Sequence, residues 1–226
     1  MDAIEPADFA RILHEGAERE RALRWADAER LYADLVSRLQ HAKGGDAQGM
    51  RALALLRHAN ALMELRRWDD ARAALDEALR EAKGSGDPEA IAQALLAAGV
   101  FAANRNDSAR AEAFLLDALE RFHRKDDRPS LQGRGWAFLN LATLYGKTGR
   151  LDLAFVTFTK AQDVLGAAQD WAGVATAWES QAQLRRAIHD EDRWKEDLAE
   201  AVIFYDRGGM TEKATRLRAL LGKRLV

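Results

Sequence analysis

The stretch WAFLNLATLYGKTGRLDLA, residues 136–154, decides the fold of this chain. Apolar residues recur in it at intervals of three and four up to Tyr145, the pattern stops at Thr148 and Gly149, and it resumes at Leu151. This period is typical of an amphipathic α-helix, and a restart after a short glycine-containing turn indicates a second helix folded back on the first. The stretch is therefore expected to form the centre of a helical hairpin.

The same features recur along the chain at a regular spacing. Four sets of equivalent positions are each separated by 43, 40, 43 and 40 residues, and most positions in three of the sets hold Gly or Ala. Two helices approach closely only where the facing side chains are small, and a large residue one turn away fills the space beside the contact. The four sets are Gly16, Ala59, Gly99, Ala142 and Ala182; Ala28, Ala71, Ala111, Ala154 and Trp194; Tyr32, Leu75, Leu115, Phe158 and Leu198; and Leu35, Ala78, Ala118, Ala161 and Ala201.

This repeat predicts an all-α fold, an α-solenoid superhelix of about five antiparallel helical hairpins with a C-terminal capping helix. Glycine-containing segments separate most of the blocks and suit helix ends. The whole chain, residues 1–226, is expected to form a single domain. The predicted hairpins cover about residues 7–42, 48–83, 89–124, 131–165 and 171–206, and the predicted capping helix covers about residues 211–223.

The composition fits a protein of this kind. The 226 residues are 48% hydrophobic, include only 3 Pro and no Cys, and carry a net charge of −2. Such a chain is long enough to bury a sizeable core, and the absence of Cys excludes disulfides and thiolate chemistry. The N-terminal residues lack the pattern of a secretory signal, and no apolar run approaches the roughly 20 residues needed to cross a bilayer. We expect a cytoplasmic protein without a membrane segment.

The repeated positions resemble those of the tetratricopeptide repeat family. Residues 136–161 match its series of bulky, Leu, small, Tyr, Gly, Ala, Phe and Ala residues, and Asn106 stands in an earlier block where Gly149 stands here. The resemblance covers about residues 7–206. Blocks of 40 and 43 residues exceed the usual length of about 34, so the chain resembles the longer bacterial subtype. Trp194 and Arg185 depart from the pattern in the fifth hairpin.

The resemblance implies a noncatalytic scaffold that binds a protein or peptide partner along the first helices of successive hairpins, which line a concave groove. Several of the matched positions are apolar, which favours an amphipathic helix or an apolar peptide as the ligand. Trp136 and Trp178 are large enough to act as anchors. The implied partner-binding positions are Leu53, Leu56, Asn60, Met63, Gln93, Leu96, Val100, Asn104, Trp136, Leu139, Thr143, Lys147 and Arg186.

Other interpretations of these positions remain open. The apolar residues would also suit packing between neighbouring hairpins, filling of the groove by the chain's own terminal helix, or contact within a homodimer. A peptide-responsive regulatory sensor is an alternative to a passive adaptor. RNA binding is a further alternative, although the slightly negative net charge and the lack of repeated basic pairs disfavour nucleic acid.

The sequence offers little support for catalysis. The histidines His14, His41, His58, His123 and His189 are scattered over different blocks, and no pair of them has the spacing of a metal site. The acidic residues gather in turns and on faces where solvated charges are common. We therefore expect no catalytic residues, no metal site and no cofactor.

Overall fold

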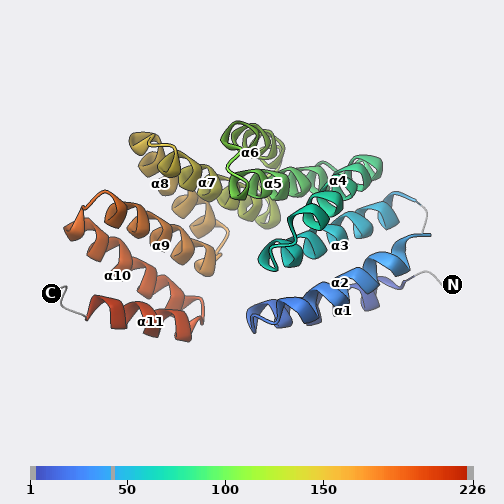
Figure 1. The fold of residues 1–226 in the computed structure, drawn as a ribbon, viewed down its shortest axis with the longest axis horizontal. Helices are drawn as coiled ribbons and strands as arrows, with labels where there is room; N and C mark the ends of the chain where they lie inside the picture. Colours follow the sequence, from blue (N-terminus) through green and yellow to red (C-terminus); the bar gives the residue numbers. More distant parts are fainter. Residues whose placement is uncertain (1–3, 42–43, 223–226) are drawn as a thin grey trace. The chain divides into compact units, whose positions relative to one another are not determined.

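The computed structural model describes residues 4–41 and 44–222, and the regular secondary structure of these residues is entirely helical (Figure 1). The predicted all-α class is therefore confirmed. The helices are α1 (Pro6–Arg21), α2 (Trp25–Leu39), α3 (Gly45–Glu64), α4 (Trp68–Ser85), α5 (Pro88–Asn104), α6 (Ser108–Phe122), α7 (Arg128–Lys147), α8 (Leu151–Ala167), α9 (Trp171–Ala187), α10 (Glu191–Arg207) and α11 (Thr211–Leu221).

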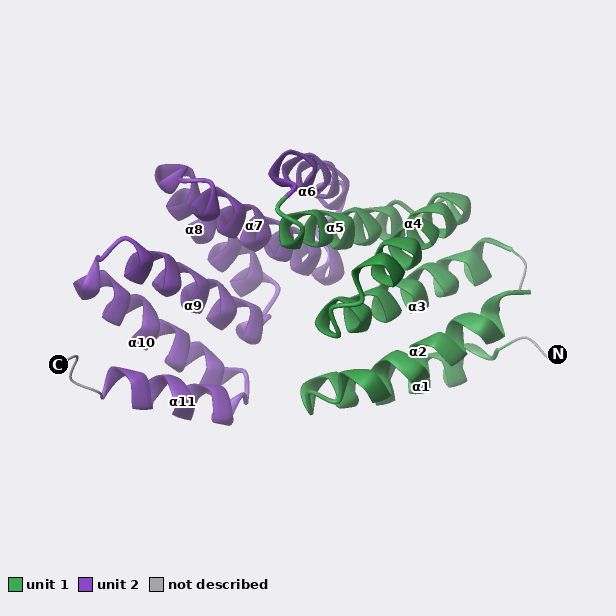
Figure 2. Ribbon diagram, in the orientation of Figure 1, with its two compact units in different colours: residues 1–106 green, residues 107–226 purple. Residues whose placement is uncertain are grey.

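The helices group into two compact units (Figure 2). Unit 1, residues 1–106, contains the hairpins α1–α2 and α3–α4 together with α5. Unit 2, residues 107–226, contains α6, the hairpins α7–α8 and α9–α10, and α11, which packs against α10 as the predicted final helix. The boundary falls inside the predicted third hairpin, between α5 and α6. The expected single-domain organisation stays a prediction.

Two helices begin earlier than the sequence predicts. The start of α7 is Arg128 and not residue 131, because the side chain of Asp127 accepts a hydrogen bond from the backbone N–H of Ser130 at 3.0 Å and Pro129 suits a first helical turn. The start of α3 is Gly45 and not residue 48. Gly44 precedes it with a φ of 106°, a conformation that glycine adopts readily. The predicted helix ends at residues 42 and 223 lie outside the described residues.

The repeated small and large positions are buried in both units. Every position of the four sets is buried, and most of the alanines have no exposed surface. Gly16 shows the constraint directly, because a Cβ atom there would overlap the ring of Tyr32. Tyr32 is itself fully buried, and its hydroxyl donates a hydrogen bond to Glu20 at 2.9 Å, so the ring has no room to move aside. The predicted helix register is therefore confirmed.

Trp194 and Arg185, which depart from the repeat, are both accommodated in the α9–α10 hairpin. Trp194 is buried beside Ala175 and Ala182. The Arg185 guanidinium lies 3.7 Å from the centroid of the Phe155 ring and forms an ion pair with Asp190 at 3.0 Å. Stacking on an aromatic face and pairing with a carboxylate compensate for the loss of water around a buried cation.

The turns that follow the first helix of each repeated block share one backbone feature. Each contains a residue with a positive φ, and these residues follow the spacing of 43, 40, 43 and 40 seen in the core sets. In the first turn, the N–H of Arg24 donates to the carbonyl of Arg19 at 2.8 Å, a bond typical of a helix that ends in a left-handed residue. Of these turn residues, only Asn106 and Gly149 could be matched to each other from the sequence. The full set is Leu23, Arg66, Asn106, Gly149 and His189.

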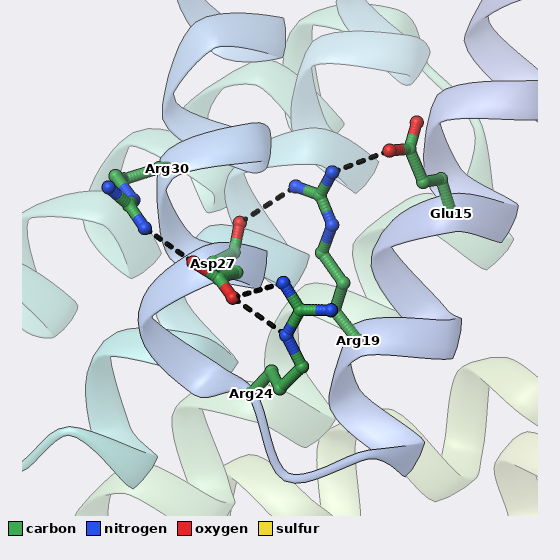
Figure 3. A network of polar contacts seen from close by, with 5 residues as sticks. All are labelled: Glu15, Arg19, Arg24, Asp27 and Arg30. Atoms are coloured by element: carbon green, nitrogen blue, oxygen red, sulfur yellow. Dashed lines mark hydrogen bonds and ion pairs between the residues drawn. The ribbon is translucent and has the colours of Figure 1, made fainter.

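Charged side chains tie the first turn to the helices on either side of it (Figure 3). Arg19 on α1 donates to the backbone carbonyl of Asp27 on α2 at 3.0 Å and also pairs with Glu15. The Asp27 carboxylate accepts hydrogen bonds from Arg24, at 2.7 Å, and from Arg30. These two arginines, with Arg24 contributing most, hold the pKa of Asp27 below its ordinary value. The network fixes where α2 leaves the turn.

The close contact at Gly16 predicts opposite effects for the same substitution at two glycines. Gly16→Ala places a methyl group against buried Tyr32, and overpacking of this kind costs about 1–3 kcal/mol. Gly49→Ala meets nothing within 4 Å and lies inside α3, where alanine is favoured over glycine by about 0.5–1 kcal/mol. Urea unfolding should show Gly16→Ala less stable and Gly49→Ala more stable than wild type. Equal free energies of unfolding would contradict the contact.

The left-handed turn residue predicts a stabilising substitution. Leu23 is 73% exposed, so removing its side chain loses little packing, while its φ of 56° strains a residue that has a Cβ atom. Leu23→Gly relieves this strain and should raise the free energy of unfolding by about 0.5–1 kcal/mol, after allowance for the greater freedom of glycine in the unfolded chain. Leu23→Ala keeps the Cβ atom and is the control. A similar gain in both variants would show that the backbone conformation is not its source.

Candidate binding site

The predicted partner-binding residues of unit 1 divide between surface and core. Leu53 and Asn60 on α3, and Leu96 and Val100 on α5, are half-buried, as is Gln93. Asn104 is exposed and is the last residue of α5. Leu56 and Met63 are only 6% and 8% exposed and belong to the core cluster between α3 and α4.

In unit 2, Trp136 and Thr143 on α7 are half-buried, and Lys147 is exposed at the end of the same helix. Leu139 is 4% exposed and packs with Phe158 and Val174.

Arg186 on α9 is exposed, and its guanidinium lies 5.4 Å from the centroid of the Trp194 ring. The assignment of Met63 and Leu139 to an open surface is thus corrected, and Leu56 keeps only a small exposed part. Their side chains take part in the packing of the hairpins, which was one of the alternatives left by the sequence.

A pocket lies in unit 1 between α3 and α5, which are the first helices of two successive blocks. Its volume is about 220 Å³. It brings together the predicted residues Leu53, Leu56 and Gln93. The remainder of the lining was not predicted from the sequence, and it consists of two small residues of α3 and the beginning of α5. These further residues are Gly49, Ala52, Asp87, Glu89 and Ala90.

The pocket has an apolar floor and an acidic rim. Asp87 caps α5, because its Oδ1 atom accepts a hydrogen bond from the backbone N–H of Glu89 at 3.0 Å. Gln93 donates to the Glu89 carboxylate at 3.3 Å, one turn further along the helix. An apolar cavity with a few fixed polar groups at its mouth is the usual form of a site that binds a side chain or small ligand.

The corresponding place in unit 2 is built from larger side chains. One pair of blocks further along the chain, Gln132 stands where Gly49 does, Trp136 where Leu53 does, and Asp170 where Asp87 does. The indole Nε1 of Trp136 on α7 donates to Asp170 Oδ2 at 3.0 Å, and Gln132 donates to the same oxygen at 3.4 Å. Asp170 also caps α9 by accepting from the N–H of Gly173 at 2.9 Å. Trp136 is therefore a structural bridge between α7 and α9.

A second pocket, of about 670 Å³, lies among α8, α9 and α10 of unit 2. Trp178, one of the two candidate anchors, lines this pocket together with Trp171 and Phe204. Trp171 stacks on Phe204 with ring centroids 6.1 Å apart, and the Arg207 guanidinium lies 3.6 Å from the Trp171 centroid. The chain's own residues thus already engage much of the aromatic surface here.

Chemistry-bearing groups are dispersed in the part of the chain that the structure describes. Among these residues no group of three or more His, Asp or Glu side chains is placed to hold a metal ion. The buried carboxyl group of Asp197 has its pKa raised by loss of solvent, an effect that Gln181 and Arg185 oppose. No helix in the described ranges is both long and apolar enough to cross a membrane.

Comparison with known proteins finds no matching family model and no matching curated protein. The solved structures that share the fold include the following three. BtubC (BKLC) from P. vanneervenii is 21% identical with a TM-score of 0.63, over 97% of this chain and 84% of that one.

Aspartyl phosphate phosphatase F from Bacillus subtilis is 12% identical with a TM-score of 0.64, and the match covers 98% of this chain but only 60% of the phosphatase. A Rap protein complexed with Competence and Sporulation Factor is 12% identical with a TM-score of 0.53, over 97% of this chain and 75% of that one. At these identities the likeness shows the fold alone, a solenoid of helical repeats. The resemblance to tetratricopeptide repeats stays a prediction. The assignment to the longer bacterial subtype stays a prediction.

The two capping aspartates predict a contrast between equivalent substitutions. Serine caps a helix about as well as aspartate, so Asp87→Ser should change stability by only a few tenths of a kcal/mol. Asp170→Ser also removes the acceptor of the Trp136 indole, and loss of a hydrogen bond to a charged group should cost about 1.5–3 kcal/mol. Urea unfolding measures both, and the Trp136 indole N–H resonance should move in the Asp170 variant. Equal losses would show that the indole bond contributes nothing.

Proposed function

We propose that the protein is a noncatalytic interaction scaffold that binds a peptide or amphipathic helix of a protein partner across α3 and α5. The pocket between these helices carries the proposal. Its apolar floor, formed by Leu53, Leu56 and Ala90, suits burial of a large apolar side chain. Its rim carries the carboxylates of Asp87 and Glu89, and the exposed Asp87 suits a hydrogen-bond donor beside such a side chain in a peptide.

The half-buried residues that continue along the same helices extend the proposed surface. Asn60 on α3 and Leu96 and Val100 on α5 supply a mixed polar and apolar surface of the kind that a peptide covers. Burying one large side chain contributes about 1.5–3 kcal/mol, whereas micromolar affinity needs about 8 kcal/mol. The pocket therefore serves as an anchor within a longer contact.

The fold and the local charge agree with this function. A solved structure with the same fold is a complex with a second molecule, which supports a binding role for such helical repeats. The carboxylates at the pocket disfavour nucleic acid, whose phosphates they would repel. A cytoplasmic location and the distinction between a passive adaptor and a peptide-responsive sensor remain predictions, as does contact within a homodimer.

Peptide selection tests the proposal. We expect a random-peptide phage library panned on the wild-type protein to yield binders with micromolar affinity, measured with labelled peptides by fluorescence polarisation. The variant Asn60→Lys, Gln93→Lys changes two half-buried polar residues of α3 and α5 and removes no core side chain. It should weaken the selected peptides by at least about tenfold, a loss of about 1.4 kcal/mol in binding free energy.

A charge-matched variant controls for nonspecific effects. Ser37→Lys, Ala73→Lys adds the same two charges on exposed positions of the second helices α2 and α4 and should bind as wild type does. Circular dichroism checks that both variants keep their helices. If no peptide is selected, or if both variants lose binding equally, the proposed site is wrong.

A further inference from the structure

Each unit contains a pair of neighbouring first helices, and the two pairs have the same register. The pairs differ in the side chains at the helix ends where the two helices of a pair meet. In unit 2 the pair is α7 and α9, and the Trp136 side chain reaches from one to the capping residue of the other. In unit 1 the pair is α3 and α5, which contact each other as α7 and α9 do. Comparing the side chains of the two pairs therefore shows which groups are present between α7 and α9 but absent between α3 and α5.

Trp136 satisfies two requirements at once in unit 2. Its ring packs against the core cluster that contains Leu139 and Val174, so part of its apolar surface is removed from water. Its Nε1–H donates to Asp170 Oδ2. The other carboxylate oxygen, Oδ1, caps α9 by accepting from the N–H of Gly173. An indole combines a large apolar surface with one donor, and buried indoles usually find an acceptor for that donor.

Unit 1 has the equivalent helices α3 and α5 and the equivalent acceptor Asp87, but none of the described residues that line the pocket between these helices has a side chain as large as that of Trp136. Leu53 is shorter than Trp136, and at Gly49 a Cβ atom would meet nothing within 4 Å. Asp87 Oδ1 accepts the N–H of Glu89, and no hydrogen bond to its Oδ2 occurs within residues 4–41 and 44–222. The resulting space of about 220 Å³ is below the range of about 300–1,000 Å³ typical of sites for whole small ligands. It fits a single side chain.

From this we propose that the α3–α5 pocket binds a tryptophan side chain of the partner peptide, with the indole N–H donated to the free oxygen of Asp87. The inference rests on the proposed function and names the residue that anchors the peptide. The apolar floor of Leu53, Leu56 and Ala90 favours an aromatic ring over the charged head of Lys or Arg, which would lose its water there. The arrangement reproduces, with a partner's residue, the bridge that Trp136 forms within unit 2.

Binding of a single amino-acid probe tests this pocket apart from any selected peptide. N-acetyl-L-tryptophanamide is titrated into the isotopically labelled protein, and backbone amide shifts are followed by NMR. We expect shifts confined to residues 49–56 and 87–93. The 1-methylindole analogue of the probe cannot donate the hydrogen bond and should bind about fivefold to tenfold more weakly. N-acetyl-L-argininamide is the cationic comparison and should bind more weakly than the tryptophan probe.

Two variants test the assigned atoms. Leu53→Trp introduces the residue found at the equivalent position of α7, should fill the pocket from within, and should abolish the shifts while the protein stays folded. Asp87→Ser keeps the helix cap but removes the second acceptor. It should weaken the tryptophan probe about fivefold to tenfold and leave the 1-methylindole analogue unchanged.

The outcomes separate this inference from the proposed function. Absence of shifts at 49–56 and 87–93, tighter binding of the arginine probe, or unchanged binding by Leu53→Trp would overturn the tryptophan assignment. If peptides are nevertheless selected at α3 and α5 without enrichment of tryptophan, the proposed function stands and only this inference fails. If no peptide is selected although the probe binds as expected, the proposed function fails and the pocket remains an indole site.

Discussion

Close approach of two helices at a residue with little or no side chain is the constraint on which the rest of this structure depends. Gly16 lies against the ring of Tyr32, and Ala28 is fully buried in the same hairpin. Because larger residues at these positions would force the helices apart, the spacing of the small residues also sets where each turn must fall. The left-handed turn residues accordingly keep the same spacing as the core positions. Each first helix is thereby aligned with its second helix in the same register in every hairpin that a unit contains.

Much of this arrangement could be predicted from the sequence, because close packing leaves a pattern of residue sizes that survives in the chain. The exposure of individual apolar residues could not. A first helix is covered on one side by its own second helix and on another by the next first helix, so a helical period identifies its apolar face without showing which part stays open. Leu53 and Leu56 are one turn apart on α3, yet the first is half-buried and the second lies in the core. Leu56 belongs to the cluster that α3 forms with α4 and α5, whereas Leu53 is only partly covered by the cluster that includes residues of α1 and α2.

The pocket between α3 and α5 escaped prediction for another reason: it is created by what is missing. Gly49 contributes no side chain, and Asp87 belongs to a link between hairpins, where an acidic residue is usually explained by its capping role alone. Neither residue signals a site when a single block is considered. The signal lies in the comparison of one pair of blocks with the next, where Gln132, Trp136 and Asp170 form a continuous bridge. The helical period of the sequence is enough to predict the helices. The pocket becomes evident only from the residues that differ between equivalent positions of the two pairs of blocks.

The contrast between the two units also bears on why the pocket exists. Filling it would require no new fold, because α7 and α9 show that Gln and Trp are accommodated in this framework. A filled bridge would add buried apolar area and a hydrogen bond to a charged acceptor, both of which stabilise a hairpin pair. Unit 1 instead keeps an open space with its acceptor exposed. A site that forgoes available stability is a common sign of function, since binding surfaces must leave their best contacts unmade until the ligand arrives. This unused stability is the physical reason for the proposal that a partner completes the contact in the pocket.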